Sequence, residues 1–251
     1  MSLPLTYPSQ SLRFLETLNR KDKLSNGIGR TATVPEILPA RLKLDIVIVG
    51  AGLGGLALAI ALARRGHAVQ ILEQAPQLGE VGAGIQIPPN SGRLLHRWGV
   101  FEHLEKWAVQ PEAINFRRWE DGTVIGHTAL GDAFEDNFET PYYVVHRAHF
   151  HEALHQRALQ LGVVVKLGCK VVKYNEKQGS VMLDNGIMVR GDLVVAADGI
   201  KSVARDSMFP DEHHEPIFDG FAAYRATVDV KKMRNDPDIA WILERPALNI
   251  W

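Results

Sequence analysis

The sequence predicts an α/β fold organised around one nucleotide-binding strand–helix–strand unit, with a second, smaller β-sheet interleaved with it. Three observations predict the unit. A β-branched run, Asp45–Val49, leads into a glycine-rich segment at 50–55. Apolar residues then recur with helical spacing up to Ile60, and a second short apolar run follows at 68–73. Strand, helix and strand within about 30 residues are typical of a parallel βαβ unit.

The composition is that of an ordinary globular protein. The 251 residues are 46% apolar and 23% charged, and 28 basic against 29 acidic residues give a net charge of −1. This balance offers no electrostatic surface for nucleic acid or an anionic membrane, so neither is expected as a partner. The single cysteine, Cys169, cannot form an internal disulfide, which favours the reducing cytoplasm. Its apolar neighbours predict a buried, unreactive thiol.

Residues 1–44 are expected to form a disordered leader outside the fold, because they contain four prolines and lack a continuous apolar core. Seven basic residues against three acidic ones leave an organelle-targeting peptide as the alternative. No secretory signal is visible.

Residues 46–63 are uncharged and mostly apolar, and they imitate a short membrane-spanning helix. Gly50 and Gly54 even have the spacing of a helix-dimer motif. Four glycines in the first half of this segment disfavour a continuous helix. A strand, a turn and a helix are therefore favoured over a membrane span.

The rest of the chain is expected to alternate short strands and helices. Strands are expected at 80–87, 114–119, 123–128, 142–146, 163–167, 171–175, 180–183, 187–189, 193–197 and 221–230, and helices at 91–98, 101–107 and 150–161. Asp121-Gly122 predicts a hairpin turn. The wholly apolar run at 193–197 predicts a strand in the buried part of a sheet.

The glycines form a G-x-G-x-x-G pattern between strand and helix. Gly50 permits the tight turn, Gly52 lets a pyrophosphate approach the backbone, and Gly55 lets the helix pack closely on the strand. The helix N-terminus offers N–H groups to the phosphates. Glu73 ends the second strand, about 20 residues after Gly52, where an acid binds a ribose hydroxyl. The pattern predicts a dinucleotide site without saying which dinucleotide it takes.

A second pattern, His151-Glu152-Ala153-Leu154-His155, has the H-E-x-x-H spacing of a zinc protease. Histidine is common in this chain, and no third ligand is obvious, although His213 and His214 are available. His151 and His155 are offset from the apolar face of the predicted helix. We therefore expect exposed histidines and no metal site.

Asp198-Gly199 directly follows the apolar run at 193–197. A carboxylate there lies at the carboxyl edge of a sheet, where α/β folds bind ligands. The alternative is a turn acid that caps the next helix.

Several segments in order resemble the FAD-dependent aromatic-ring monooxygenases, and salicylate hydroxylase-like members most of all. They are GAGLGGLALAIALARRGHAVQILEQAP, VGAGIQIPPN, HRAHFHEAL, ADGIKSVAR and GFAAYRATV, and the resemblance runs from about Leu42 to the end of the chain. It implies a Rossmann-like FAD-binding domain.

The resemblance also implies residue roles. The positions expected to bind FAD are Gly50, Gly52, Gly55, Glu73, Ala83, Arg147, Asp198 and Gly199. Arg147 is expected to contact a phosphate or ribose, and Asp198-Gly199 is linked with both the flavin and the passing nicotinamide. Arg225 is expected to face the substrate and is the one residue assigned to catalysis.

The chemistry that the resemblance implies is hydroxylation of a phenolic or related small molecule. NADH or NADPH reduces the flavin, O2 adds to give a C4a-hydroperoxyflavin, and one oxygen passes to the ring. The protein's part is to orient the ring and exclude water.

The implied domains are an FAD-binding domain at 45–120 and 142–210, a substrate-domain excursion at 121–141, and the start of the substrate sheet at 211–251. A second family motif, Gly-Asp followed by small residues and His-Pro, is not found, since Gly131-Asp132 and Gly191-Asp192 lie elsewhere in the order. We therefore expect an incomplete substrate domain in a truncated chain. A nucleotide-binding remnant without activity and an NAD-linked dehydrogenase remain as alternatives.

Overall fold

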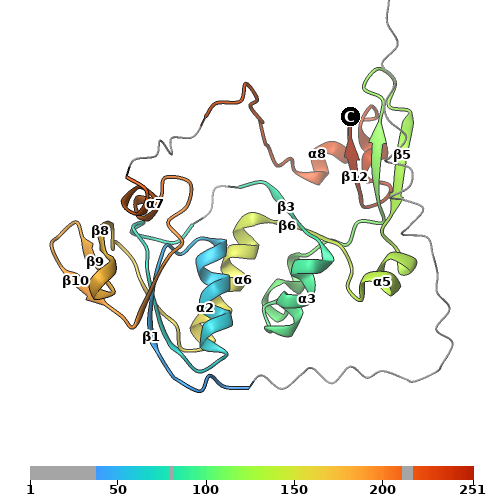
Figure 1. Cartoon of the computed structure of the whole chain (residues 1–251). Helices are drawn as coiled ribbons and strands as arrows, with labels where there is room; N and C mark the ends of the chain where they lie inside the picture. The colour runs from blue at the N-terminus through green and yellow to red at the C-terminus, as the bar shows by residue number, and fades with distance from the viewer. Residues whose placement is uncertain (1–37, 80–81, 211–216) are drawn as a thin grey trace, which may run out of the picture. The chain divides into compact units, whose positions relative to one another are not determined.

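Strands β1 (Asp45–Val49) and β2 (Ala68–Leu72) form the middle of a four-stranded parallel sheet. The computed structural model describes residues 38–79, 82–210 and 217–251. The sheet has the order β11-β1-β2-β7, and β11 (Leu193–Ala196) and β7 (Val164–Lys166) are its edges. Helix α2 (Leu53–Ala63) connects β1 to β2. The predicted α/β class and the βαβ unit are confirmed (Figure 1).

The remaining elements are short. They are β3 (Gly84–Ile87), α3 (Pro89–Arg97), α4 (Phe101–Leu104), η1 (Glu105–Trp107), β4 (Ala113–Arg117), β5 (Val124–Ala129), α5 (Asp132–Phe138), β6 (Tyr143–His146), α6 (Arg147–Gln160), β8 (Val171–Asn175), η2 (Glu176–Gln178), β9 (Ser180–Leu183), β10 (Met188–Arg190), α7 (Val203–Met208), α8 (Val230–Arg234), η3 (Ala240–Leu243) and β12 (Ala247–Ile250).

Alternate side chains of β1 enter two separate cores, because successive residues of a strand point to opposite faces. Ile46 and Ile48 pack with α2 and α6, which lie side by side (Figure 1). Val47 and Val49 pack on the other face against residues of β8 and β9. Each fully buried aliphatic side chain contributes about 1.5–3 kcal/mol to folding. The parallel sheet is thus covered on both faces, and its free space lies at its ends.

Three further sheets complete the described structure. β10, β9 and β8 form an antiparallel sheet, and β3 pairs antiparallel with β6. In the third, β4 pairs antiparallel with β5 and parallel with β12, so residues near the end of the chain join the predicted hairpin. The loop between β4 and β5 contains Asp121-Gly122, as the hairpin signal predicts.

Two strand predictions need correction. The run at 193–197 was expected in the buried part of a sheet, but β11 pairs only with β1 and forms an edge of the sheet. Leu193 is accordingly 43% exposed. The segment at 221–230 was expected as a strand, yet residues 221–229 have no strand assignment and are exposed. An extended segment becomes a strand only with a hydrogen-bonded neighbour, and none of the described strands pairs with it.

The predicted leader lies mostly outside the described residues. Of 1–44, only 38–44 are described. The Ala40 N–H donates to the Arg65 carbonyl at 2.8 Å, and the Leu44 N–H donates to His67 Nδ1 at 3.2 Å. These bonds attach the chain before β1 to the turn between α2 and β2.

Candidate functional site

The turn after β1 depends on two close backbone approaches. Gly50 has φ +105°, and a Cβ there would lie 2.3 Å from the Ala197 carbonyl oxygen. A Cβ on Gly55 would lie 2.0 Å from the Gly50 carbonyl oxygen. Any other residue at either position would push α2 or the end of β11 away from the turn. These two glycines therefore build the turn and its packing rather than open space for a ligand.

Gly52 differs, because a Cβ there would meet no atom within 4 Å. It is the N-cap of α2 and supplies no side-chain cap. The first helical hydrogen bond runs from the Leu56 N–H to the Gly52 carbonyl at 3.0 Å. The N–H groups ahead of Leu56 are left for a ligand or water, at the positive end of the helix dipole. This arrangement suits a phosphate group.

Glu73 follows β2 and reaches back to the glycine turn. Its Oε2 accepts from the Ala51 N–H at 2.7 Å, and its Oε1 accepts from the Ala75 N–H at 2.9 Å. Each carboxylate oxygen has a second lone pair, so the side chain can also accept from a ligand hydroxyl. Glu73 therefore holds the glycine turn through Ala51 and can bind a ligand at the same time.

His151 on α6 supports the same turn, which corrects the expectation of an exposed histidine. It is 5% exposed, and its Nε2 lies 2.7 Å from the Ala51 carbonyl oxygen. A carbonyl only accepts, so this nitrogen carries a proton. Ala51 is thus held on both sides, its N–H by Glu73 and its carbonyl by His151.

The zinc alternative finds no support. His155 is half-buried, and its Nδ1 lies 3.8 Å from Glu152 Oε2. The two other histidines that were available as a third ligand, His213 and His214, lie outside the described residues. Within the described ranges, no group of three or more His, Cys, Asp or Glu side chains could hold a metal ion.

Asp198 lies just after the edge strand β11, and its side chain accepts hydrogen bonds from residues at the start of α7. Its Oδ1 accepts from Ser202 Oγ at 2.6 Å, and its Oδ2 accepts from the Ala204 N–H and the Tyr174 hydroxyl, each at 3.2 Å. Burial acts to raise the pKa of Asp198, but these hydrogen bonds outweigh it and lower the pKa below its ordinary value. Burial, and then the charge of Asp198, raise the pKa of Tyr174. Ser202 is the N-cap of α7, and Asp198, for which helix capping was the alternative, accepts one N–H of the first turn of that helix.

The carboxyl ends of β1, β2 and β11 meet at one edge of the parallel sheet, as parallel pairing requires. A cavity of about 400 Å³ lies there. Five of the sequence-predicted residues line it, namely Gly50, Gly52, Glu73, Asp198 and Gly199. Lys170 and Lys201 also line it and add positive charge beside the helix N-terminus.

Cys169 lines the same cavity and is half-buried, so the prediction of a buried thiol is wrong. It follows β7 after the turn at Gly168, where the sheet ends at the cavity.

A second cavity of about 460 Å³ collects the other predicted residues. Ala83, Arg147 and Arg225 line it. The backbone N–H of Arg147 donates to the Ala83 carbonyl at 3.1 Å, and a Cβ on Gly82 would lie 2.9 Å from Arg147 Cβ. Glycine at 82 therefore allows the segment before β3 to touch the start of α6. Arg225 brings a second guanidinium group to the lining of this cavity.

The described residues fit a dinucleotide such as FAD. They provide an open approach at Gly52, a helix N-terminus, an acid at the end of β2 and two lysines within one cavity. No helix in the described part of the chain is long and apolar enough to cross a membrane. The apolar run at 46–63 instead forms β1, the turn and α2.

Sequence reasoning missed Tyr174 and Ser202, which hold Asp198 in place, and it assigned His151 to solvent although His151 holds the glycine turn. His151 and Ala51 are 100 positions apart, and no local pattern links them. Lys201 could have been found, because it follows Asp198-Gly199 at the same edge of the sheet.

Comparisons with known proteins agree with this geometry. Residues 43–247 match the FAD binding domain family. The FAD-dependent monooxygenase OpS4 of Beauveria bassiana is 36% identical over 213 residues, which are 84% of this chain and 50% of that protein. The 3-amino-4-hydroxybenzoate 2-monooxygenase of Streptomyces cremeus is 39% identical over 203 residues, 79% of this chain and 50% of that protein.

A solved structure is similar too. A crystal structure of a 2-methyl-3-hydroxypyridine-5-carboxylic acid oxygenase variant has a TM-score of 0.59 at 28% identity, covering 66% of this chain and 42% of that one. The chain spans about half the length of the curated relatives it matches. The family predicted from the motifs is confirmed, and the chain belongs to the FAD binding domain family.

Proposed function

We propose that this chain binds FAD and acts as an FAD-dependent monooxygenase on a small aromatic molecule. The observation that carries the proposal is the cavity at the carboxyl edge of the parallel sheet, where Gly52, Glu73 and Asp198 face one space. Its relatives include proteins named as monooxygenases, one of them on 3-amino-4-hydroxybenzoate. A nicotinamide dehydrogenase has no comparable support.

Each residue then has a role that its position suits. Gly50 and Gly55 keep the turn tight, and the N-terminus of α2 beside Gly52 binds the pyrophosphate. Glu73 accepts from the adenosine ribose while holding Ala51. Asp198 and Gly199 border the same cavity, and Ala83 and Arg147 continue the cofactor site in the second cavity.

Bound FAD would supply the redox chemistry, taking electrons from NADH or NADPH and activating O2. The chain's own residues bind and orient the reactants. Arg225 shares a cavity with Arg147 and Ala83, which supports a role for its guanidinium in binding an anionic group of the substrate next to the cofactor site. Holding a ring in one pose beside the cofactor is the protein's contribution to rate.

We also propose a division of the chain and a location. Residues 45–112 and 142–210 form the FAD-binding part, and β4, β5 and β12 belong to a substrate part. The first boundary moves from 120 to about 112 because β4 pairs with β5 and β12. The single cysteine supports the proposal of a cytoplasmic location.

The test is turnover by protein reconstituted with FAD. NADH or NADPH oxidation is followed with a panel of hydroxybenzoates and aminohydroxybenzoates, and products are identified by mass. We expect one ring to stimulate oxidation and to gain one oxygen atom, and Arg225→Gln to raise its KM about tenfold or more, as loss of an ion pair implies. FAD-loaded protein that hydroxylates no member of the panel would support a binding remnant.

A further inference from the structure

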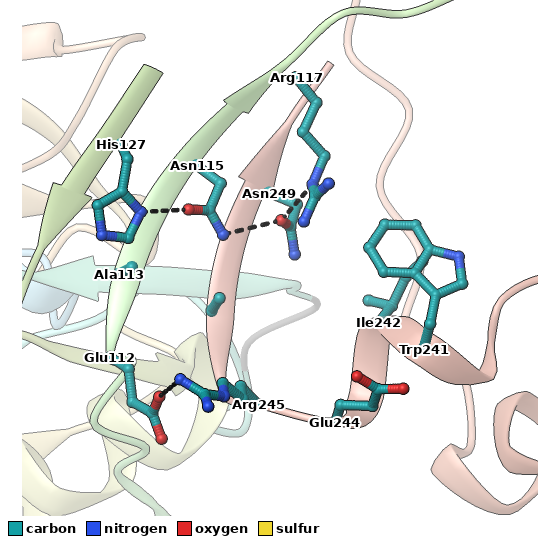
Figure 2. Close-up of a pocket in the computed structure, with 11 residues that line it drawn as sticks. Glu112, Ala113, Asn115, Arg117, His127, Trp241, Ile242, Glu244, Arg245 and Asn249 are labelled. Carbon is teal, nitrogen blue, oxygen red and sulfur yellow. Dashed lines mark hydrogen bonds and ion pairs between the residues drawn. The ribbon is translucent and has the colours of Figure 1, made fainter. Parts of the chain in front are cut away.

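The sheet of β12, β4 and β5 carries a row of polar side chains on one face. Asn115 on β4 lies opposite Asn249 on β12 and opposite His127 on β5. Cross-strand neighbours share a face, and so does Arg117, two residues after Asn115. Figure 2 shows these side chains along one side of a pocket, with Trp241 and Ile242 of η3 on the other. The cavity measures about 320 Å³.

The hydrogen bonds in this row all run toward amide oxygens. His127 Nδ1 lies 2.8 Å from Asn115 Oδ1, Asn115 Nδ2 donates to Asn249 Oδ1 at 3.2 Å, and Arg117 Nε donates to the same oxygen at 2.8 Å (Figure 2). Both amide oxygens are thereby used as acceptors. Among the described residues, the Asn249 amide nitrogen and the Arg117 Nη2 have no hydrogen-bond partner. The row therefore presents donors to the cavity, which suits a ligand rich in acceptors.

Arg117 is a fixed positive charge in this cavity. Its Nη1 donates to the Gly122 carbonyl at 2.8 Å, and its guanidinium lies 4.6 Å from the centre of the Trp241 ring. Trp241 is itself held, since its Nε1 donates to the Asp238 carbonyl at 3.0 Å. No carboxylate among the described residues forms an ion pair with Arg117. A guanidinium held in this way is ready to bind an oxyanion in a fixed orientation.

Neither of the two carboxylates that line the cavity forms an ion pair with Arg117 among the described residues. Glu112 lies 3.8 Å from Arg245 and pairs with it (Figure 2). Glu244 lines the cavity and is exposed. Ala113, Ala247 and Ile242 also line the cavity and add apolar surface to it. An ordinary solvated sheet face would carry side chains directed to water, whereas these are hydrogen-bonded to one another, and Arg117 lies over a tryptophan ring.

We propose that this cavity binds a small aromatic carboxylate. Its carboxylate would pair with Arg117 and accept from the Asn249 amide, and its ring would lie against Trp241 and the alanines. The volume is at the lower end of the range for small-molecule sites. None of its lining residues lines the two cavities assigned to FAD. The inference does not rest on the proposed monooxygenase activity.

The test is calorimetric titration of the full chain with benzoate, benzamide and inorganic phosphate. We expect benzoate to bind, and uncharged benzamide to bind at least about tenfold more weakly because the charged pair is lost. Arg117→Gln should weaken benzoate by at least about tenfold. Arg118→Gln, one residue away and outside the cavity, should leave benzoate affinity unchanged.

Trp241→Leu is the second variant, expected to weaken benzoate about fivefold by removing the ring surface. FAD affinity is measured for every variant and should equal the wild-type value, which separates this inference from the proposed function. The proposal is overturned if the wild type does not bind benzoate. It is also overturned if Arg117→Gln and Trp241→Leu bind benzoate as tightly as the wild type. Phosphate that binds as well as benzoate overturns it too, because the site would then recognise an oxyanion without a ring.

Discussion

Glu73 holds the Ala51 N–H and faces the cavity, so its carboxylate serves both the turn and the ligand. We expect Glu73→Ala to weaken FAD binding by about 1–3 kcal/mol, the cost of a lost hydrogen-bonded charge. The measurement is a fluorescence titration of FAD. Gln74→Ala is the control, because Gln74 lines the same cavity without a hydrogen bond to the turn among the described residues. An equal effect of the two substitutions would contradict the role given to Glu73.

His151 holds the other side of Ala51 from a buried position. We expect His151→Phe to lower the free energy of unfolding by about 1–3 kcal/mol, since it leaves a buried carbonyl unpaired, and to weaken FAD binding. His151→Gln keeps a donor and should recover part of both losses. His155→Phe, on the same helix but without a bond to the turn, should change FAD affinity little. Urea unfolding and FAD titration test this, and a matching loss in His155→Phe would refute it.

Asp198 predicts a pH dependence of stability. Because its pKa is lowered in the folded protein, its stabilising effect is full above the unfolded-state pKa and is lost as the pH falls through the folded-state value. Tyr174 has a raised pKa and stays a donor at neutral pH. We expect Asp198→Asn to lower the free energy of unfolding at pH 7, and the difference from wild type to shrink below about pH 4. A difference that is constant between pH 3 and pH 7 would contradict this assignment.

At the scale of elements, two neighbouring glycines of α2 should respond in opposite ways to the same substitution. Gly55→Ala places a Cβ 2.0 Å from the Gly50 carbonyl oxygen, so it should destabilise the fold by about 1–3 kcal/mol and disturb the turn. Gly54→Ala meets no atom within 4 Å and should stabilise α2 by up to about 1 kcal/mol. Thermal unfolding of both variants decides the matter. If Gly55→Ala lowered the melting temperature no more than Gly54→Ala does, α2 would not pack on the turn as described.

The elements that sequence reasoning predicted well are those fixed by local pattern. The strand, glycine turn, helix and second strand at 45–73 follow from periodicity and glycine placement alone. The strand expected at 221–230 failed because strand formation depends on a pairing partner elsewhere in the chain. The edge position of β11 is likewise a property of sheet order, and an apolar run does not reveal it.

The same distinction applies to the candidate site. Gly50, Gly52, Gly55 and Glu73 lie within one short motif and are brought together as that motif predicts. His151 was misjudged, because its partner lies 100 residues away and the helix pattern placed it toward solvent. The bond between Arg117 and Asn249 spans 132 residues and has no sequence signature.

At the scale of the whole molecule, the chain belongs to the FAD binding domain family. It spans about half the length of the curated relatives it matches. The central claim is therefore that this chain binds FAD, since both cavities proposed for the cofactor draw most of their lining from residues 45–210. If the claim holds, the catalytic proposal rests on a loaded cofactor site.

The most direct measurement is the absorbance spectrum of the purified chain after incubation with excess FAD and removal of unbound flavin. We predict about one FAD per chain, in the oxidised flavin spectrum, and a ratio well below one for Glu73→Ala under the same conditions. Colourless protein that remains folded by circular dichroism and retains no FAD would contradict the account.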